Sequence, residues 1–300
     1  MHPTGRAGLP DSGTILEKGA YDERVSTHPA AMTPATATVV DGAESWIGTP
    51  PAGVEHRGAV LLSHGFTGSP ISMRPWGEHL ASLGFTVSVP RLAGHGTTWQ
   101  EMNRTEWTDW YGVVEAELLR LAAEHGGRVA VGALSMGGSL ALRLAEQHPE
   151  IVAGLALVNP SVGSADPKMR LVPVLSRFVP SIGAIANDIA KPGISEGAYD
   201  RTPLRAVASM MKLWRTVRAD LARVECPVLL FRSEVDHVVD PSSAATILTG
   251  ISSEDATERL LHRSFHVATL DFDADDIFAE STEFFTDCLV PSGPSVAAEE

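Results

Sequence analysis

The 300-residue sequence has few cysteines, few aromatic residues, a deficit of basic residues and no long hydrophobic run. Its two cysteines, Cys226 and Cys288, are too few for a disulfide framework or a cysteine-based metal cluster. No stretch approaches the roughly 18 uninterrupted apolar residues of a membrane span, and the first residues lack the apolar core of a secretory signal. We therefore expect a cytoplasmic protein without stable membrane insertion.

The charge balance is acidic, with 23 lysines and arginines against 37 aspartates and glutamates and a formal net charge of −14. Nucleic acids and anionic membranes attract basic surfaces, so this balance argues against both as partners. The hydrophobic content of 44% is that of an ordinary globular protein. The length suits one α/β domain with tails and an insertion, or two small domains.

The strongest functional signal is RVAVGALSMGGSLAL, residues 128–142. A run of β-forming residues leads to Ser135, and Gly137, Gly138 and a helical pattern follow at once. A strand, a tight turn with serine at its apex and a helix are the pattern of a nucleophile elbow. Such a turn needs small neighbouring residues, because the strand and the departing helix pass close together. Ala133 stands two residues before the serine, where a glycine is usual, and departs from the motif by one methyl group. The alternative is a glycine-rich turn whose serine caps the helix.

The remaining pattern alternates strands with helices. Strands are expected near 59–65, 85–90, 129–134, 151–159, 226–233 and 258–264. Because these strands are almost wholly apolar, they predict a mostly parallel sheet covered by helices on both faces.

Residues 161–221 interrupt the alternation with five prolines and an amphipathic run. We expect a helical cap insertion over the carboxyl ends of the strands, where such sheets bind ligands; ordinary crossover helices are the alternative. The α/β core then comprises 36–160 and 222–290. Residues 1–35 are expected to be a disordered tail, and 291–300 a second tail.

A serine hydroxyl becomes a good nucleophile when a base removes its proton and an acid fixes the tautomer of that base. In a parallel sheet these groups come from loops at the carboxyl ends of strands. Asp236 and His266 occupy two such loops, and with Ser135 they appear in the order Ser, Asp, His. Among the other candidates, Glu234 and Asp240 are interpreted as loop charges and His262 as a strand residue. His237 follows Asp236 too closely to be oriented by it, and His64 and His95 are interpreted as loop-bracing histidines.

Attack on an ester creates an oxyanion that needs preorganised donors. The backbone N–H groups of Phe66 and Met136 are the predicted donors, since Phe66 follows an apolar strand and Met136 follows the serine. This chemistry needs no metal and no organic cofactor.

Five segments together resemble the bacterial monoacylglycerol lipases and related small carboxylesterases of the α/β-hydrolase family: HGFTGSPISMRPW, VPRLAGHGT, GALSMGGSLALRLAEQHP, SEVDHVV and SFHVATLD. The resemblance runs from about Gly58 to Phe285. It implies an α/β-hydrolase fold with Ser135 as nucleophile, His266 as general base and Asp236 as its orienting partner.

The resemblance also implies a cap that forms an acyl tunnel and an alcohol pocket. Glu196 matches an acidic cap position that hydrogen-bonds glycerol hydroxyls, with a surface charge as the alternative reading. Apolar cap residues that either house an acyl chain or pack the cap onto the core are Ile182, Ile185, Met210, Met211, Leu213 and Trp214.

The functional hypothesis is a serine hydrolase that cleaves carboxylic esters, in the first place monoacylglycerols, through an acyl-enzyme. One alternative is a general short-chain carboxylesterase, or a perhydrolase with the same triad. Another, from a different class, is a ligand receptor built on a hydrolase scaffold.

Overall fold

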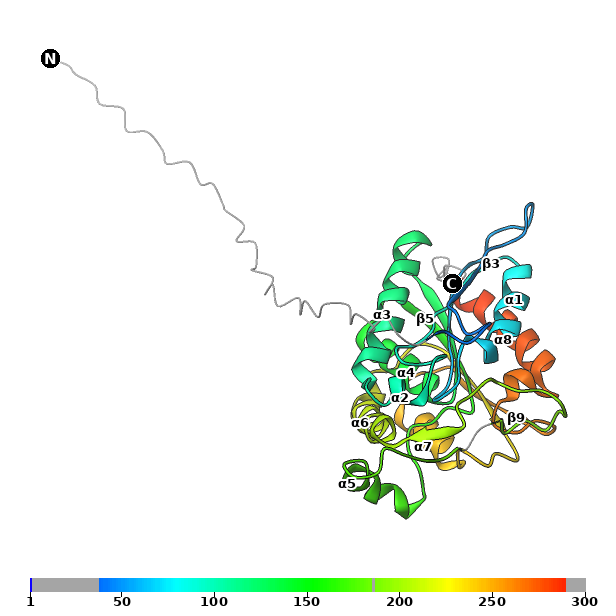
Figure 1. Ribbon diagram of the computed structural model, residues 1–300. Helices are drawn as coiled ribbons and strands as arrows, with labels where there is room; N and C mark the ends of the chain where they lie inside the picture. The colour runs from blue at the N-terminus through cyan, green and yellow to red at the C-terminus, as the bar shows by residue number, and fades with distance from the viewer. Residues whose placement is uncertain (2–37, 185–186, 290–300) are drawn as a thin grey trace. The chain divides into compact units, whose positions relative to one another are not determined.

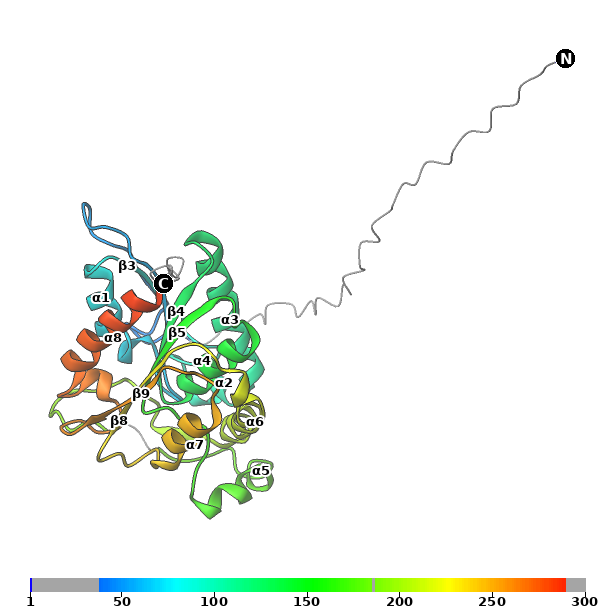
Figure 2. The ribbon, with the colours of Figure 1, turned by 180° about the vertical axis from the view of Figure 1, so that it is seen from behind.

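The computed structural model describes Met1 and residues 38–184 and 187–289, so the two predicted tails lie, apart from Met1, outside the described residues. A seven-stranded sheet has the order β1-β3-β2-β4-β5-β8-β9 (Figures 1 and 2). Only β1 pairs antiparallel within it. The strands are β1 (Trp46–Gly48), β2 (Gly58–Ser63), β3 (Phe85–Val89), β4 (Val129–Leu134), β5 (Val152–Val158), β8 (Val228–Ser233) and β9 (Ala256–Leu261).

Helices cover both faces of this sheet, as Figure 1 shows with α3 and α4 on one side and α1 and α8 on the other. Strands β3, β4 and β5 are buried along their whole length, which explains the unbroken apolar sequences of β4 and β5; β3 also buries Thr86 and Ser88. The predicted α/β architecture is confirmed. Helices outside the segment 161–221 are η1 (Pro70–Ser72), α1 (Arg74–Ser82), α2 (Trp99–Met102), α3 (Trp107–Glu124), α4 (Met136–Gln147), α7 (Ser242–Gly250), η4 (Ala268–Leu270) and α8 (Ala274–Leu289).

Residues 161–221 contain short helices and a small second sheet. Their elements are η2 (Pro167–Leu171), α5 (Val172–Leu175), β6 (Ser181–Gly183), β7 (Arg201–Pro203), α6 (Leu204–Asp220) and η3 (Leu221–Arg223). The antiparallel pair β6–β7 was not predicted, because strands of three residues are too short to show a periodic pattern. Helix α6 packs against α4, which places this segment beside the helix that follows Ser135.

None of the helices in the described ranges is both long and apolar enough to cross a membrane.

Candidate active site

Ser135 occupies the turn between β4 and α4 with a φ of 55°, in the region that L-residues rarely adopt. Two backbone hydrogen bonds hold this turn. The N–H of Ser135 donates to the Val158 carbonyl at 3.0 Å, and the N–H of Ser161 donates to the Ser135 carbonyl at 3.1 Å. The strained conformation is therefore fixed from the neighbouring strand β5 and the loop that follows it.

The glycines after the serine are required by close packing. A Cβ on Gly137 would lie 2.4 Å from the Ser63 carbonyl oxygen, and one on Gly138 would lie 2.7 Å from Pro160 Cβ. Ala133 is fully buried in the sheet, and the turn keeps its positive φ with this extra methyl group present. The backbone at Ser135 thus has the conformation that the sequence predicted for a nucleophile elbow.

His266 and Asp236 form a buried pair. His266 Nδ1 donates to Asp236 Oδ2 at 2.8 Å, and the two side chains are 8% and 6% exposed. Asp236 Oδ1 accepts the N–H groups of Val238 and Val239, each at 2.8 Å. Burial alone would raise the pKa of Asp236, but the His266 contact and these N–H donors hold that pKa below its ordinary value. The carboxylate is therefore anionic, and it accepts the Nδ1 proton of His266 and fixes the orientation of the imidazole ring.

Ser135 and His266 line one cavity of about 350 Å³. Its wall is largely apolar, and more than half of its lining residues come from the segment 161–221. Of the six apolar residues predicted for an acyl pocket, Ile182, Met210 and Trp214 line the cavity. Leu213 is instead buried in the core and Met211 lies at a second cavity, while Ile185 falls outside the described residues.

The loop of Phe66 passes directly beside the serine. A Cβ on Gly65 would lie 3.2 Å from Ser135 Cβ, a tight contact that a side chain could make only if the serine shifted by a few tenths of an ångström. Phe66 lines the cavity, and Met136 is the first residue of α4, whose N–H has no acceptor within the helix.

Glu196 is 9% exposed and lines the same cavity. Its Oε1 accepts the N–H of Asn187 at 2.9 Å. Burial raises its pKa, against the opposing effect of the Asn187 hydrogen bond. The reading of Glu196 as a solvated surface charge is therefore wrong.

Two supporting residues were missed by sequence reasoning. Asn159 accepts the Ser233 N–H at 2.8 Å through Oδ1 and donates through Nδ2 to the His266 carbonyl at 2.7 Å. Asp188 accepts the N–H groups of His266 at 3.2 Å and His237 at 3.1 Å. Together they fix the loops of the base and the acid. The sequence offered one indication for Asn159, because this residue ends the apolar strand that follows the elbow strand in the chain. It offered no indication for Asp188.

The alternative acids and bases have other partners. His262 contacts Glu234 at 3.0 Å, and both side chains are more than half exposed. Asp240 accepts the N–H of Ser242 and of Ala165, each at 3.0 Å. His237 pairs with Asp188 rather than Asp236, and its side chain is 59% exposed.

His64 and His95 are both buried, and their rings pack edge to face with centroids 5.1 Å apart. His64 Nδ1 donates to the Gly65 carbonyl at 3.0 Å, and Nε2 accepts the Leu92 N–H at 3.2 Å. Burial lowers the pKa of His64 from 6.5 to about 4. A neutral His64 therefore ties the loop after β2 to the loop after β3.

The described residues contain no group of three or more His, Cys, Asp or Glu side chains arranged to hold a metal ion.

Comparison with known proteins gives consistent similarities. The model of the family described as "Serine aminopeptidase, S33" matches residues 54–273. A thermostable monoacylglycerol lipase from a Bacillus species is 42% identical over 75% of this chain and 89% of the relative. A carboxylesterase from Bacillus subtilis is 26% identical over 75% of this chain and 91% of that protein. A solved structure of metagenome-derived lipolytic enzymes matches with a TM-score of 0.78 and 36% identity, covering 83% of this chain and 100% of that one.

Acidification should destabilise the fold through His64. The unfolded chain binds a proton on this histidine below pH 6.5, whereas the folded chain excludes it until about pH 4. The part of the unfolding free energy that depends on a neutral His64 is fully present above pH 6.5 and is lost as the pH falls. By pH 4 the unfolding free energy is lower by about 3 kcal/mol. Urea unfolding across this range measures it. The His64→Asn variant should show a shallower pH slope, and the exposed control His262→Asn an unchanged one; equal slopes for all three proteins would contradict the assignment.

Proposed function

Because this chain belongs to the α/β-hydrolase family described as serine aminopeptidase S33, we propose that it is a serine hydrolase of carboxylic esters, with monoacylglycerols as its main substrates. One observation carries the proposal. Ser135, on a turn with positive φ, shares a cavity with His266, whose Nδ1 is bonded to the buried Asp236. The 42% identity to a monoacylglycerol lipase supports the substrate class.

The reaction follows from the proton positions. His266 Nε2 takes the hydroxyl proton of Ser135 as its Oγ attacks the ester carbon, and Asp236 stabilises the imidazolium that forms. The backbone N–H groups of Phe66 and Met136 donate to the oxyanion. His266 then protonates the departing alcohol, which leaves an acyl group on Ser135. Water repeats the sequence and releases the carboxylic acid.

The segment 161–221 acts in this proposal as the cap that holds the acyl chain. Its buried or half-buried apolar side chains form the wall of the cavity opposite Ser135, and Val207, Met210 and Trp214 of α6 contribute to it. Apolar walls of this kind bind an alkyl chain by removing it from water. The triad residues lie on the core, and the chain-binding residues lie on the cap.

Glu196 would receive the alcohol part of the substrate. It is the buried carboxylate at the Gly68 side of the cavity, where a Cβ on Gly68 would lie 3.5 Å from Glu196 Oε2. Oε1 is occupied by the Asn187 N–H, and Oε2 is left to accept a substrate hydroxyl.

A general carboxylesterase is the second candidate, favoured by the 26% identity to a carboxylesterase. It uses the same triad and differs in the acyl chains and alcohols that it accepts.

The first test measures hydrolysis of monoacylglycerols and of nitrophenyl esters over a range of chain lengths. Ser135→Ala should abolish turnover of every substrate, and Asp236→Asn should lower kcat by on the order of 10⁴-fold because His266 takes the wrong tautomer. Circular dichroism provides the control that both variants fold. Activity confined to short nitrophenyl esters would favour the general carboxylesterase, and a nearly fully active Asp236→Asn would show that the acid is misassigned.

The second test separates the alcohol site from the triad. Glu196→Gln should raise the KM for a monoacylglycerol by roughly tenfold, the loss of one hydrogen bond to a charged group. It should leave the nitrophenyl ester of the same acyl chain unaffected. Glu234→Gln, an exposed carboxylate outside the cavity, is the matched control. An equal loss on both substrates would remove Glu196 from glycerol binding.

A further inference from the structure

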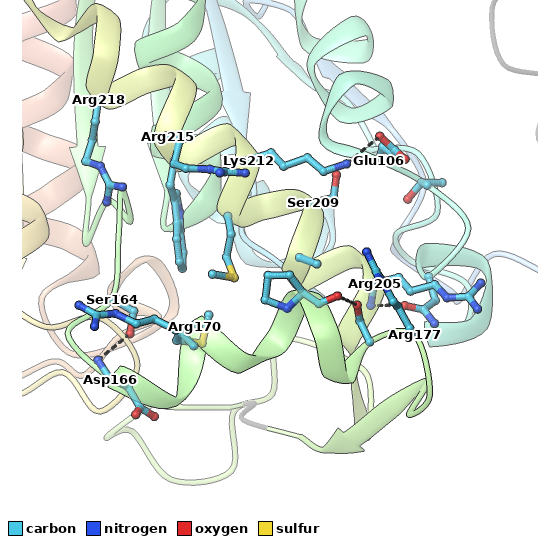
Figure 3. Close-up of a pocket in the computed structure, with 18 of the residues that line it drawn as sticks. Glu106, Ser164, Asp166, Arg170, Arg177, Arg205, Ser209, Lys212, Arg215 and Arg218 are labelled. Carbon is cyan, nitrogen blue, oxygen red and sulfur yellow. Dashed lines mark hydrogen bonds and ion pairs between the residues drawn. The ribbon is translucent and has the colours of Figure 1, made fainter.

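A second, larger cavity lies on the outer side of the cap, between α6 and the segment η2–α5 (Figure 3). Its volume is about 1140 Å³, and seven basic but only two acidic residues line it. Five of the basic side chains are named here the cationic groove: Arg170, Arg177, Arg205, Lys212 and Arg215. Figure 3 shows that Lys212 and Arg215 extend from α6, while Arg170 and Arg177 come from the segment below it.

Most of these cations lack an acidic partner. Lys212 lies 3.7 Å from Glu106, but within the described part of the chain the four arginines of the cationic groove contact no carboxylate. The other acidic residue at the cavity, Asp166, accepts the N–H of Lys168. An acidic protein therefore keeps a cluster of uncompensated positive charge on one exposed surface.

The charge of the whole chain is unevenly distributed. Residues 161–221 carry 9 basic and 5 acidic residues, whereas the rest of the chain carries 14 and 32. The cap is thus net positive on a strongly negative body. Such an asymmetry orients the protein in the field of an anionic surface, with the cap toward that surface.

The same cap segment exposes an apolar stripe, defined as Leu171, Val174, Leu175 and Phe178. These side chains are 65%, 60%, 41% and 81% exposed. Leu171 ends η2, and Val174 and Leu175 lie in α5. Phe178 lies in the turn that follows α5, where its N–H donates to the Leu175 carbonyl at 3.0 Å. Both ribbon views place α5 at the outer end of the cap (Figures 1 and 2).

We infer that the cationic groove and the apolar stripe form a docking surface for a lipid bilayer with anionic headgroups. Basic side chains next to an exposed apolar helical face are the combination that binds such an interface. A free phosphate or a nucleic acid would leave the apolar stripe exposed to water. A second copy joined by a two-fold axis would bring the positive surfaces together and repel.

The docking surface adjoins the active-site cavity. Ser164, Asp166, Met169 and Trp214 line both cavities, so a docked cap places the acyl-binding wall next to the bilayer. The advantage of placing the acyl-binding wall next to the bilayer rests on the proposed hydrolysis of lipid esters. The docking itself does not depend on turnover. The formal net charge of −14 describes the whole chain and conceals this local positive cluster, so the proposal replaces the expectation that the acidic charge balance excludes anionic membranes.

Vesicle sedimentation of the full chain tests the inference. Vesicles of phosphatidylcholine containing phosphatidylglycerol should bind at least tenfold more tightly than phosphatidylcholine alone, and added salt should release the protein. The double variant Arg170→Gln/Arg177→Gln should weaken binding by roughly 30-fold, about fivefold for each cation. Its matched control is Arg57→Gln/Arg128→Gln, on exposed arginines that precede β2 and β4 at the opposite ends of the strands.

The apolar stripe is tested by Phe178→Ser, which should weaken vesicle binding, against Ile47→Ser on the exposed side of β1. All variants should hydrolyse a short soluble nitrophenyl ester at the wild-type rate, so a failure of docking is distinguished from a failure of the proposed activity. Equal binding to both kinds of vesicle, or equal loss in the cap and control variants, would overturn the inference. Absence of vesicle binding with concentration-dependent dimerisation would overturn it in favour of a second copy.

Discussion

The positive φ of Ser135 is the constraint on which the rest of the site depends. It turns the serine out of the sheet at the start of α4, and it persists because backbone contacts from β5 and the following loop hold both sides of the residue. The strain is tolerated only where neighbouring backbone can approach, which explains Gly137 and Gly138. In the proposed mechanism, His266 as the base and the N–H groups of Phe66 and Met136 as oxyanion donors then need only be brought to this one fixed point.

The loops around that point are held by polar groups rather than by apolar packing. Asn159 and Asp188 bind the loop of His266, and His64 binds the loop of Phe66. Each is a buried or half-buried group whose hydrogen bonds are costly to leave unmade, so it specifies one loop position. Asp188 itself belongs to the segment 161–221, so this segment takes part in positioning the His266 loop and, in the proposed function, also supplies the surface that binds the acyl chain. The position of the His266 loop and the proposed recognition of the acyl chain therefore depend on the same segment of the chain.

Local sequence patterns predicted the sheet, the elbow and the loops of Asp236 and His266, since each depends on residues adjacent in the chain. Contacts across the chain were not predictable. Asn159 and His266 are 107 residues apart, and Asp188 and His266 are 78 apart. The cationic groove likewise assembles arginines from η2–α5 and α6, and the stripe of exposed apolar residues resembles a buried helical face until the fold shows its exposure.

The central claim is that Ser135 is the nucleophile activated by His266. The most direct measurement is intact-mass and peptide mass spectrometry after reaction with an alkyl fluorophosphonate, which traps a serine as a stable phosphonyl ester with loss of fluoride. The account predicts a single adduct, located on the peptide that contains Ser135, and formed far more slowly in a His266→Ala variant. An adduct on another residue, or none in a protein that hydrolyses esters, would contradict it.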